Sequence, residues 1–360
     1  MGEITYFFVR NREDFNAAKN LVSKRTINLK SLTVVLWDNS FENFFINNGI
    51  NYLLFGNYAK KIDFNFVSKG VLQLVNTFPH IKILNGKTLV ELLEYDGYSL
   101  WWFLKQGFYS HCTRIIKEIY TLKLLIEERK VKNILILNED QEFLDILKEA
   151  AKESNITIKF NKKNISAGNY NFFENKKKLF LNYLPRLIRA VLGFVMSIQP
   201  IKNEKKWNVL LFTKSDVWSN ITGIIRGDTT SYTILRDMSK SGDYNTIPLD
   251  VAINTPSAWK AIKEKKKPFI PYEYFIFRSF FDSKIRKVVR QQKIRFSALW
   301  EKIDKESKLK KVLISNNIKL YQFLRQQIKS YFFSNFDSLI GTVRNIEIGK
   351  RILDEYNIDA

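Results

Sequence analysis

Four carboxylates are the residues of this chain whose types and positions best suit chemistry. Glu94 and Asp96 precede a long helical segment, whereas Glu139 and Asp140 directly follow the apolar run NILIL at 133–137. A carboxylate fixed beside a bound ligand can act as a general base and remove a proton from a hydroxyl group. Asp and Glu also favour helix N-termini because they cap the helix and complement its dipole, so a structural role is the alternative for each.

The elements that must position these carboxylates alternate between strand and helix over the first 160 residues. Each β-rich apolar run leads into polar residues and then a helix-compatible segment, which is typical of a parallel sheet covered on both faces. Ligands of such sheets lie outside the carboxyl ends of the strands. We therefore expect a Rossmann-like α/β fold with parallel strands at 4–10, 32–39, 52–58, 80–86, 133–137 and 156–160.

The composition changes after this region. We expect a Rossmann-like domain over 1–165, a linker and basic amphipathic helix over 166–206, and a second, partial and largely helical α/β domain over 207–360 with a basic helical insertion. The second domain begins with the apolar run WNVLLFT and has few convincing strands. Either another chain completes its sheet, or the sequence is the front part of a longer protein.

Charge is the strongest global property of the chain, with a formal net value of +22. From 174 to 206 eight Lys and Arg face two Glu, and from 260 to 311 seventeen face six acids, so the first 165 residues are close to neutral. This imbalance predicts negatively charged partners: anionic lipid, nucleotide and phosphate groups, or nucleic acid. The near-neutral first domain argues against a nucleic-acid surface covering the whole protein.

Several classes of protein are disfavoured by composition. One cysteine excludes an internal disulfide framework, and Cys112 with His80 and His111 is too small a set for a His/Cys metal site, so we expect no protein-held metal. The N-terminus MGEITYFFVR has no basic region followed by a long apolar core, which indicates a cytoplasmic chain. The chain has no GxGxxG, phosphate-binding loop, HExxH or nucleophile elbow, so dehydrogenase, NTPase, metalloprotease and hydrolase functions lose support.

The most apolar window, 179–198, contains two arginines and has lysines on both flanks. Its longest uncharged run, 190–201, has twelve residues, against the roughly 20 needed to span a bilayer. A helix of this composition is typical of attachment to an anionic membrane surface, although a buried interdomain helix with snorkelling arginines is the alternative. The predicted membrane-binding residues are Lys176, Lys177, Lys178, Arg186, Arg189, Lys205 and Lys206.

Candidate ligand-binding residues occur in both domains. Trp101 and Trp102 are adjacent, so both cannot face one core; one could form a stacking wall for a sugar or base, although packing is the alternative. His111 lies on the same aromatic helix and is more typical of a hydrogen-bonded core residue. Two polar loops of the second domain, KSDVWSN and RGDTTSY, contribute Ser215, Asp216, Asp228 and Thr229.

The order of several segments resembles the front part of bacterial and archaeal surface-carbohydrate glycosyltransferases of the GT-B type. These segments are LLEYDGYSLWWF, the long helix after it, NILIL with NED, the basic amphipathic segment and NVLLFTKSDVW. The likeness rests on element order and on the YDGYSLWW helix start. It implies two Rossmann-like domains, with the N-terminal domain taking the acceptor and the C-terminal domain a nucleotide-sugar.

The resemblance further implies a peripheral enzyme on the inner face of the membrane. It would transfer a sugar from a nucleotide donor, its substrate, to a lipid-linked or glycan acceptor of surface polysaccharide biosynthesis, with no cofactor. The chain ends at Ala360 before the family's glycine-rich and acidic donor loops. The alternative is a non-catalytic basic protein that binds nucleic acid or a partner subunit through 260–311, where aromatic and basic residues interleave.

Overall fold

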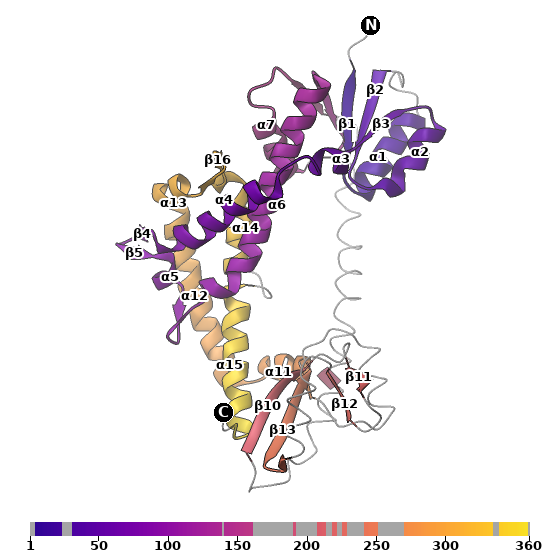
Figure 1. Ribbon diagram of the computed structural model, residues 1–360. Helices are drawn as coiled ribbons and strands as arrows, with labels where there is room; N and C mark the ends of the chain where they lie inside the picture. The colour runs from indigo at the N-terminus through magenta and orange to yellow at the C-terminus, as the bar shows by residue number, and fades with distance from the viewer. Residues whose placement is uncertain are drawn as a thin grey trace. The chain divides into compact units, whose positions relative to one another are not determined.

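The computed structural model divides the chain into two compact units (Figure 1). Unit 1 comprises Met1–Gly168 and Phe296–Leu339, and unit 2 comprises Asn169–Arg295 and Ile340–Ala360. The structure describes residues 4–23, 31–138, 140–160, 190–191, 207–213, 218–221, 225–228, 241–250, 270–333 and 338–358. No helix within these residues combines the length and the apolar character that crossing a membrane requires.

A five-stranded parallel sheet of order β3-β2-β1-β8-β9 forms the centre of unit 1. All five residues of β2, LTVVL, are buried, as expected for a β-branched strand covered on both faces. The parallel sheet therefore confirms the predicted Rossmann-like character of the first domain. Its strands are β1 (Thr5–Val9), β2 (Leu32–Leu36), β3 (Asn51–Leu54), β8 (Asn133–Ile136) and β9 (Thr157–Phe160).

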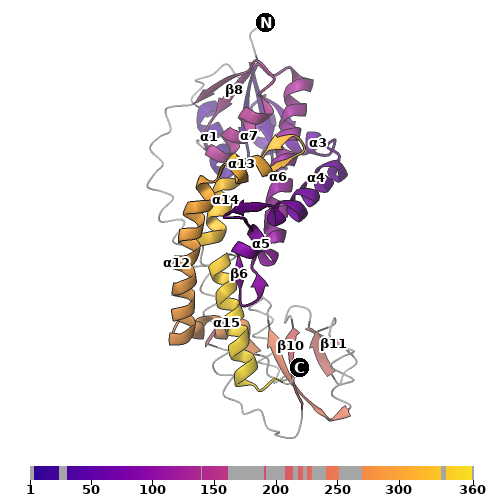
Figure 2. The same cartoon turned by 90° about the vertical axis from the view of Figure 1, so that its left-hand side faces the viewer.

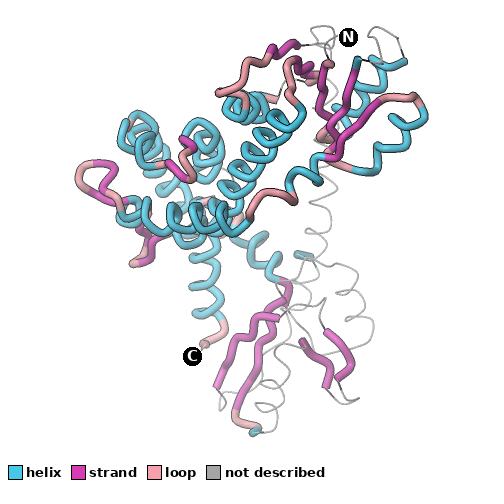
Figure 3. Tube along the Cα trace, turned by 45° about the horizontal axis from the view of Figure 1, so that its top comes forward, coloured by secondary structure: helices cyan, strands magenta, loops and turns pink. Residues whose placement is uncertain are grey.

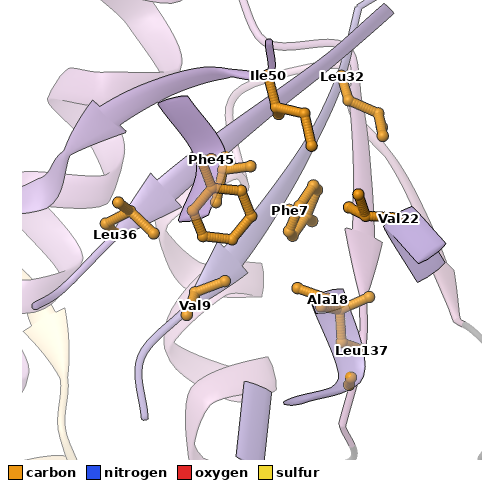
Figure 4. Packing of buried hydrophobic residues seen from close by; sticks show 11 residues of the cluster. Phe7, Val9, Ala18, Val22, Leu32, Leu36, Phe45, Ile50 and Leu137 are labelled. Carbon is orange, nitrogen blue, oxygen red and sulfur yellow. The ribbon is translucent and has the colours of Figure 1, made fainter. Parts of the chain in front are cut away.

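Two short helices, α1 (Arg12–Ser23) and α2 (Glu42–Asn47), cover one face of this sheet. Their apolar side chains meet those of β1 and β2 in a cluster centred on Phe7 and Phe45, whose ring centroids are 6.2 Å apart (Figure 4). On the other face, Phe8 packs edge-on against Phe143 of α7 (Gln141–Ala150), with centroids 5.5 Å apart. The sheet thus has a helix layer on each face.

The longest helix, α6 (Trp101–Arg129), connects the two ends of unit 1. Before it come α3 (Phe55–Ala59), α4 (Phe64–Thr77), α5 (Leu89–Leu92) and two small antiparallel hairpins. The hairpins are β4–β5 (Lys82–Leu84 with Lys87–Thr88) and β6–β7 (Glu94–Tyr95 with Tyr98–Ser99). Figure 3 shows both hairpins at the end of unit 1 away from the five-stranded sheet.

The C-terminal part of unit 1 packs on α4 and α6 (Figure 2). Tyr120 of α6 donates a hydrogen bond to the Asn316 carbonyl (2.9 Å), and Trp300 packs on Phe332 with centroids 5.3 Å apart. Hydrogen bonds from Arg325 and Tyr321 hold the pKa of Asp304 at about 2. This part comprises the end of α12 (Ser283–Lys305), α13 (Ser307–Val312), the hairpin β15–β16 (Ile314–Ser315 with Ile318–Lys319) and α14 (Tyr321–Phe333).

Unit 2 contains a small parallel sheet of order β10-β13-β14 and a separate hairpin, β11–β12. The side-chain amide of Asn208 on β10 donates to the Tyr356 carbonyl at the end of α15 (3.0 Å), which ties that helix to the sheet. The elements are β10 (Trp207–Thr213), β11 (Trp218–Ile221), β12 (Ile225–Asp228), β13 (Tyr244–Asp250), β14 (Ile270–Pro271), α11 (Tyr272–Ser279), the first half of α12, and α15 (Leu339–Glu355).

Two expectations from the sequence differ from the structure. The predicted parallel strand at 80–86 is wrong, because β4 turns at Asn85 and Gly86 and pairs antiparallel with β5. The strand expected at 52–58 ends at Leu54, and α3 begins at the next residue. The structure groups Phe296–Leu339 with unit 1, apart from the residues on either side of it.

Candidate functional site

The strand order of the large sheet reverses between β1 and β8. The chain runs from β1 through β2 to the edge strand β3, and then returns along α6 to place β8 on the other side of β1. In open parallel sheets, ligands bind where the order reverses, beside the carboxyl ends of the two strands. Arg10 follows β1 here, and Asn138 and Asp140 come after β8.

Arg10 is the centre of a network of ion pairs at this point. Its Nε donates to Asp14 Oδ2 (2.9 Å) and its Nη1 donates to Asp140 Oδ2 (2.7 Å). Asp14, whose side chain is only 2% exposed, also accepts from the Arg10 backbone N–H (3.0 Å) and from Asn138 Nδ2 (2.7 Å). The Arg10 guanidinium lies over the Phe143 ring at 4.1 Å. The network therefore connects α1 and the N-terminus of α7 with the segments that follow β1 and β8.

Burial opposes the charges of Arg10 and Asp140, but their ion pairs and hydrogen bonds outweigh it. Burial alone would lower the Arg10 pKa, but the carboxylates of Asp14 and Asp140 raise it above its usual value. Burial likewise works against ionised Asp140, but the Phe143 N–H and the Arg10 guanidinium together lower the Asp140 pKa. Asp140 also caps α7, accepting from the Phe143 N–H at 3.2 Å. Asp140 is therefore ionised and held in one position.

A second group of charges extends the network along α6 and α7. Arg114 pairs with Glu118 (3.3 Å) on its own helix and with Glu142 on α7. The Glu118 side chain is 14% exposed, and burial raises its pKa although Arg114 and Arg10 partly offset this effect. Because the charge of Asp140 also acts on Glu118, the two groups form one electrostatic site.

His111 borders this site on the same face of α6. Its Nδ1 lies 3.4 Å from Arg114 Nη2, while its Nε2 is enclosed and has no hydrogen-bond partner in the structure. Burial lowers the His111 pKa, and the neighbouring Arg114 lowers it further. His111 is therefore neutral at neutral pH, and its Nε2 is a polar atom without a partner.

The site carries more negative than positive charge. Its two cations, Arg10 and Arg114, face the four carboxylates of Asp14, Glu118, Asp140 and Glu142. A phosphate group would meet repulsion here, whereas hydroxyl groups can donate hydrogen bonds to the carboxylates. Glu118 and Asp140 have pKa values displaced in opposite directions, which is the arrangement that assigns different acid–base roles to two carboxyl groups.

The structure separates the carboxylates singled out in the sequence. Asp140 lies in the site, and Glu139 lies outside the described residues. Glu94 and Asp96 belong to the β6–β7 hairpin at the start of α6, where Asp96 occupies a turn with φ 55°. Since 13 residues of helix separate Trp101 from Arg114, the hairpin is about 20 Å away from Asp140's surroundings along α6. The structure does not bring these two carboxylates to the sheet edge.

The two adjacent tryptophans have different surroundings. Trp101 is 2% exposed and packs on Phe78 and Phe108, with centroids 5.1 and 5.4 Å away. Trp102 is 51% exposed, and Lys105 Nζ lies 5.1 Å from its ring. Trp101 is therefore a core residue, whereas the Trp102 ring remains open to a ligand.

The remaining candidates all fall within the residue range of unit 2. Asp228 is the last residue of β12, and the structure describes its backbone. The other predicted ligand-binding residues, Ser215, Asp216 and Thr229, lie outside the described residues, as do Lys176, Lys177, Lys178, Arg186, Arg189, Lys205 and Lys206. Across the described ranges, no three His, Cys, Asp or Glu side chains gather in a way that could hold a metal ion.

Sequence reasoning missed Arg10, Asp14, Arg114 and Glu118. One signal for Glu118 was present: His111 and Glu118 continue the spacing of three and four that joins Phe108, Ile115 and Leu122, all buried. A polar residue on an apolar helix stripe indicates a buried polar site. The spacing of Arg10 and Asp14, four residues apart, is the corresponding signal for the ion pair at the start of α1.

Comparisons with known proteins do not add to the geometry of this site. No protein-family model, no curated protein and no solved structure matches the chain.

Proposed function

We propose that the protein is a GT-B-like glycosyltransferase of surface polysaccharide or glycan biosynthesis, and that its acceptor binds at the carboxyl edge of the five-stranded sheet. The observation that carries the proposal is the pair of carboxyl groups with opposed pKa displacements, Glu118 and Asp140, at the reversal of strand order. The excess of carboxylates there suits an acceptor that presents hydroxyl groups.

The roles follow from the two environments. Glu118 has the raised pKa, so it is the better matched general base at neutral pH. Asp140 is fixed by Arg10 and by the N-terminus of α7. Its carboxylate accepts a hydrogen bond from a hydroxyl group of the acceptor substrate and so orients that substrate. The acceptor oxygen attacks the anomeric carbon of the donor, its proton passes to Glu118, and the bond from sugar to nucleotide breaks with the electron pair leaving on the phosphate.

The nucleotide part of the donor requires a second, less acidic surface. The parallel strands β10 and β13 of unit 2, with the strand β12 that ends in Asp228, are compatible with that role. Docking on the inner face of an anionic membrane through 176–206 belongs to the same proposal, because a lipid-linked acceptor would be found there. The rival function, a non-catalytic basic binding protein, is favoured by the exposed cations of α12.

The test is release of nucleotide from a panel of donors by the full chain. We would incubate it with UDP-, GDP- and dTDP-sugars and a bacterial lipid and glycan extract, and measure the free nucleoside diphosphate. Glu118→Gln is expected to lower the rate roughly 100-fold or more, because it removes the proton acceptor. The matched control is Asp145→Asn, on the same helix as Asp140 and paired with Gln141 instead of the site.

Two results would contradict the proposal. One is a folded wild-type chain that neither binds nor cleaves any nucleotide-sugar of the panel. The other is a Glu118→Gln variant that transfers sugar as fast as Asp145→Asn.

A further inference from the structure

The first half of α12, Ser283 to Arg295, has an unusually one-sided charge. Six of its residues are Lys or Arg and none is acidic. Arg286, Arg290 and Lys293 follow one another at spacings of four and three, so they form a single stripe on the helix. All three are exposed, as are Lys284 and Lys287. The helix thus presents a continuous positive surface to its surroundings.

This positive surface is not neutralised by acidic side chains. The structure gives no ion pair to Lys284, Arg286, Lys287, Arg290 or Lys293 within its described ranges. Cations nearby in the sequence behave differently: Arg278 pairs with Glu355 at 2.7 Å. The stripe is therefore complementary to an anionic partner from outside the described residues.

Large apolar side chains accompany the stripe. Phe281, in the turn before α12, is 68% exposed, and its ring packs on that of Phe277, itself 43% exposed, with centroids 5.2 Å apart. Ile294 is 65% exposed and lies four residues after Arg290. Exposed apolar groups next to unpaired cations need a partner with both anionic and apolar parts.

We propose that Phe277, Phe281, Arg286, Arg290, Lys293 and Ile294 form a docking surface for a bilayer that contains anionic phospholipid. The cations contact the headgroups, and the phenyl rings and Ile294 enter the boundary between headgroups and acyl chains. A nucleic acid would match the cations but would leave Ile294 without a partner, because an aliphatic side chain offers no ring for base stacking. The proposed function also invokes an anionic membrane as partner, but it places the contact at 176–206, whereas this docking surface lies within 277–294.

The experiment is flotation of the full chain with vesicles of phosphatidylcholine alone or with phosphatidylglycerol added. The triple variant Arg286→Ala, Arg290→Ala, Lys293→Ala is expected to weaken partitioning to the anionic vesicles about 100-fold, since each basic residue near such a surface contributes about fivefold. The matched control removes the same charge elsewhere: Lys302→Ala, Lys305→Ala, Lys308→Ala, all exposed. Partitioning of this control is expected to change less than threefold.

A second variant reports insertion without removing charge. Phe281→Trp should show a blue-shifted emission with anionic vesicles and quenching by lipids brominated on the acyl chain, relative to the wild-type background. No quenching, or equal loss of partitioning in both triple variants, would overturn the docking surface. Tight binding of a duplex or single-stranded oligonucleotide that only the stripe variant loses, without vesicle binding, would overturn it in favour of nucleic acid. Because lipid binding is measured without sugar transfer, this result is separate from the fate of the proposed enzyme.

Discussion

The carboxyl edge of the sheet and the β6–β7 hairpin share one sequence feature and differ in their environments. In each, two acidic residues stand just before a helix: Glu139 and Asp140 before α7, Glu94 and Asp96 before α6. Asp140 is held by Arg10, which is 130 residues away in the chain, whereas Asp96 occupies an exposed turn with a positive φ. The comparison teaches that the environment of Asp140 comes from a residue distant in the sequence. The local sequence around Asp96 determines only the turn that this residue occupies.

The largest effect is expected from removing the buried carboxylate of the sheet edge. Asp14→Ala leaves Arg10 and Asn138 without their acceptor in a buried place, which should destabilise unit 1 by about 3–5 kcal/mol. Urea unfolding followed by tryptophan fluorescence measures this. Glu13→Ala, the exposed neighbour, should change stability little, and an equally small effect of Asp14→Ala would remove the distinction between the two regions.

A smaller loss is expected at Asp140. Asp140→Ala removes the cap of α7 and one partner of Arg10, while Asp14 still binds the guanidinium, so we expect about 1–2 kcal/mol. Asp145→Ala, within α7, serves as the control in the same unfolding experiment. Equal losses for both variants would mean that the cap and ion pair contribute nothing beyond helix propensity.

The pH dependence of stability should identify Glu118. An unfolded Glu titrates near pH 4.3, and burial raises the pKa of Glu118 in the folded chain, so its contribution is complete below about pH 4.3 and is lost as pH rises through the folded value. Glu118→Gln should therefore gain stability relative to wild type as pH rises above about 4.3, the range in which the wild-type carboxyl group loses its contribution. Thermal unfolding across this range checks it, with Glu142→Gln, whose side chain is 43% exposed, expected to show a flatter difference.

The smallest effect is expected in the hairpin. Asp96→Gly keeps the positive φ without strain while increasing the freedom of the unfolded chain, so stability should change by no more than about 0.5 kcal/mol. Asp96→Val should cost about 1–2 kcal/mol, because a β-branched residue strains this conformation. Nucleotide release by Asp96→Gly should equal that of wild type. A loss of release in a stable Asp96→Gly chain would place the base in the hairpin instead of the sheet edge.

The strands of the sheet could be predicted because their signal is local. β1, β2 and β8 are short β-rich apolar runs followed by polar residues, and all three belong to the five-stranded sheet. The segment 80–86 has the same apolar character, but its Asn85-Gly86 pair is typical of a hairpin turn. Because the chain reverses there, β4 pairs antiparallel with β5 instead of joining the parallel sheet.

The site could be predicted in part only. Asp140 was found because it follows a strand, whereas its link to Arg10 joins residues that nothing in the local sequence connects. Glu118 was hidden in a helix whose periodicity predicts packing, and its raised pKa comes from burial that tertiary structure creates. The assignment of Phe296–Leu339 to unit 1 is equally non-local, since it depends on contacts such as Tyr120 with Asn316.

That discontinuity has a consequence for biosynthesis. Unit 1 begins with the first 168 residues, but its last segment ends at Leu339, roughly 170 residues later, which at about 5–20 residues per second is a delay on the order of 10–30 s. During that interval α4 and α6 would expose to the cell the surface that α14 and the β15–β16 hairpin later cover. A newly made chain therefore spends this interval with unit 1 incomplete, and an N-terminal fragment would lack the segment that covers α4 and α6.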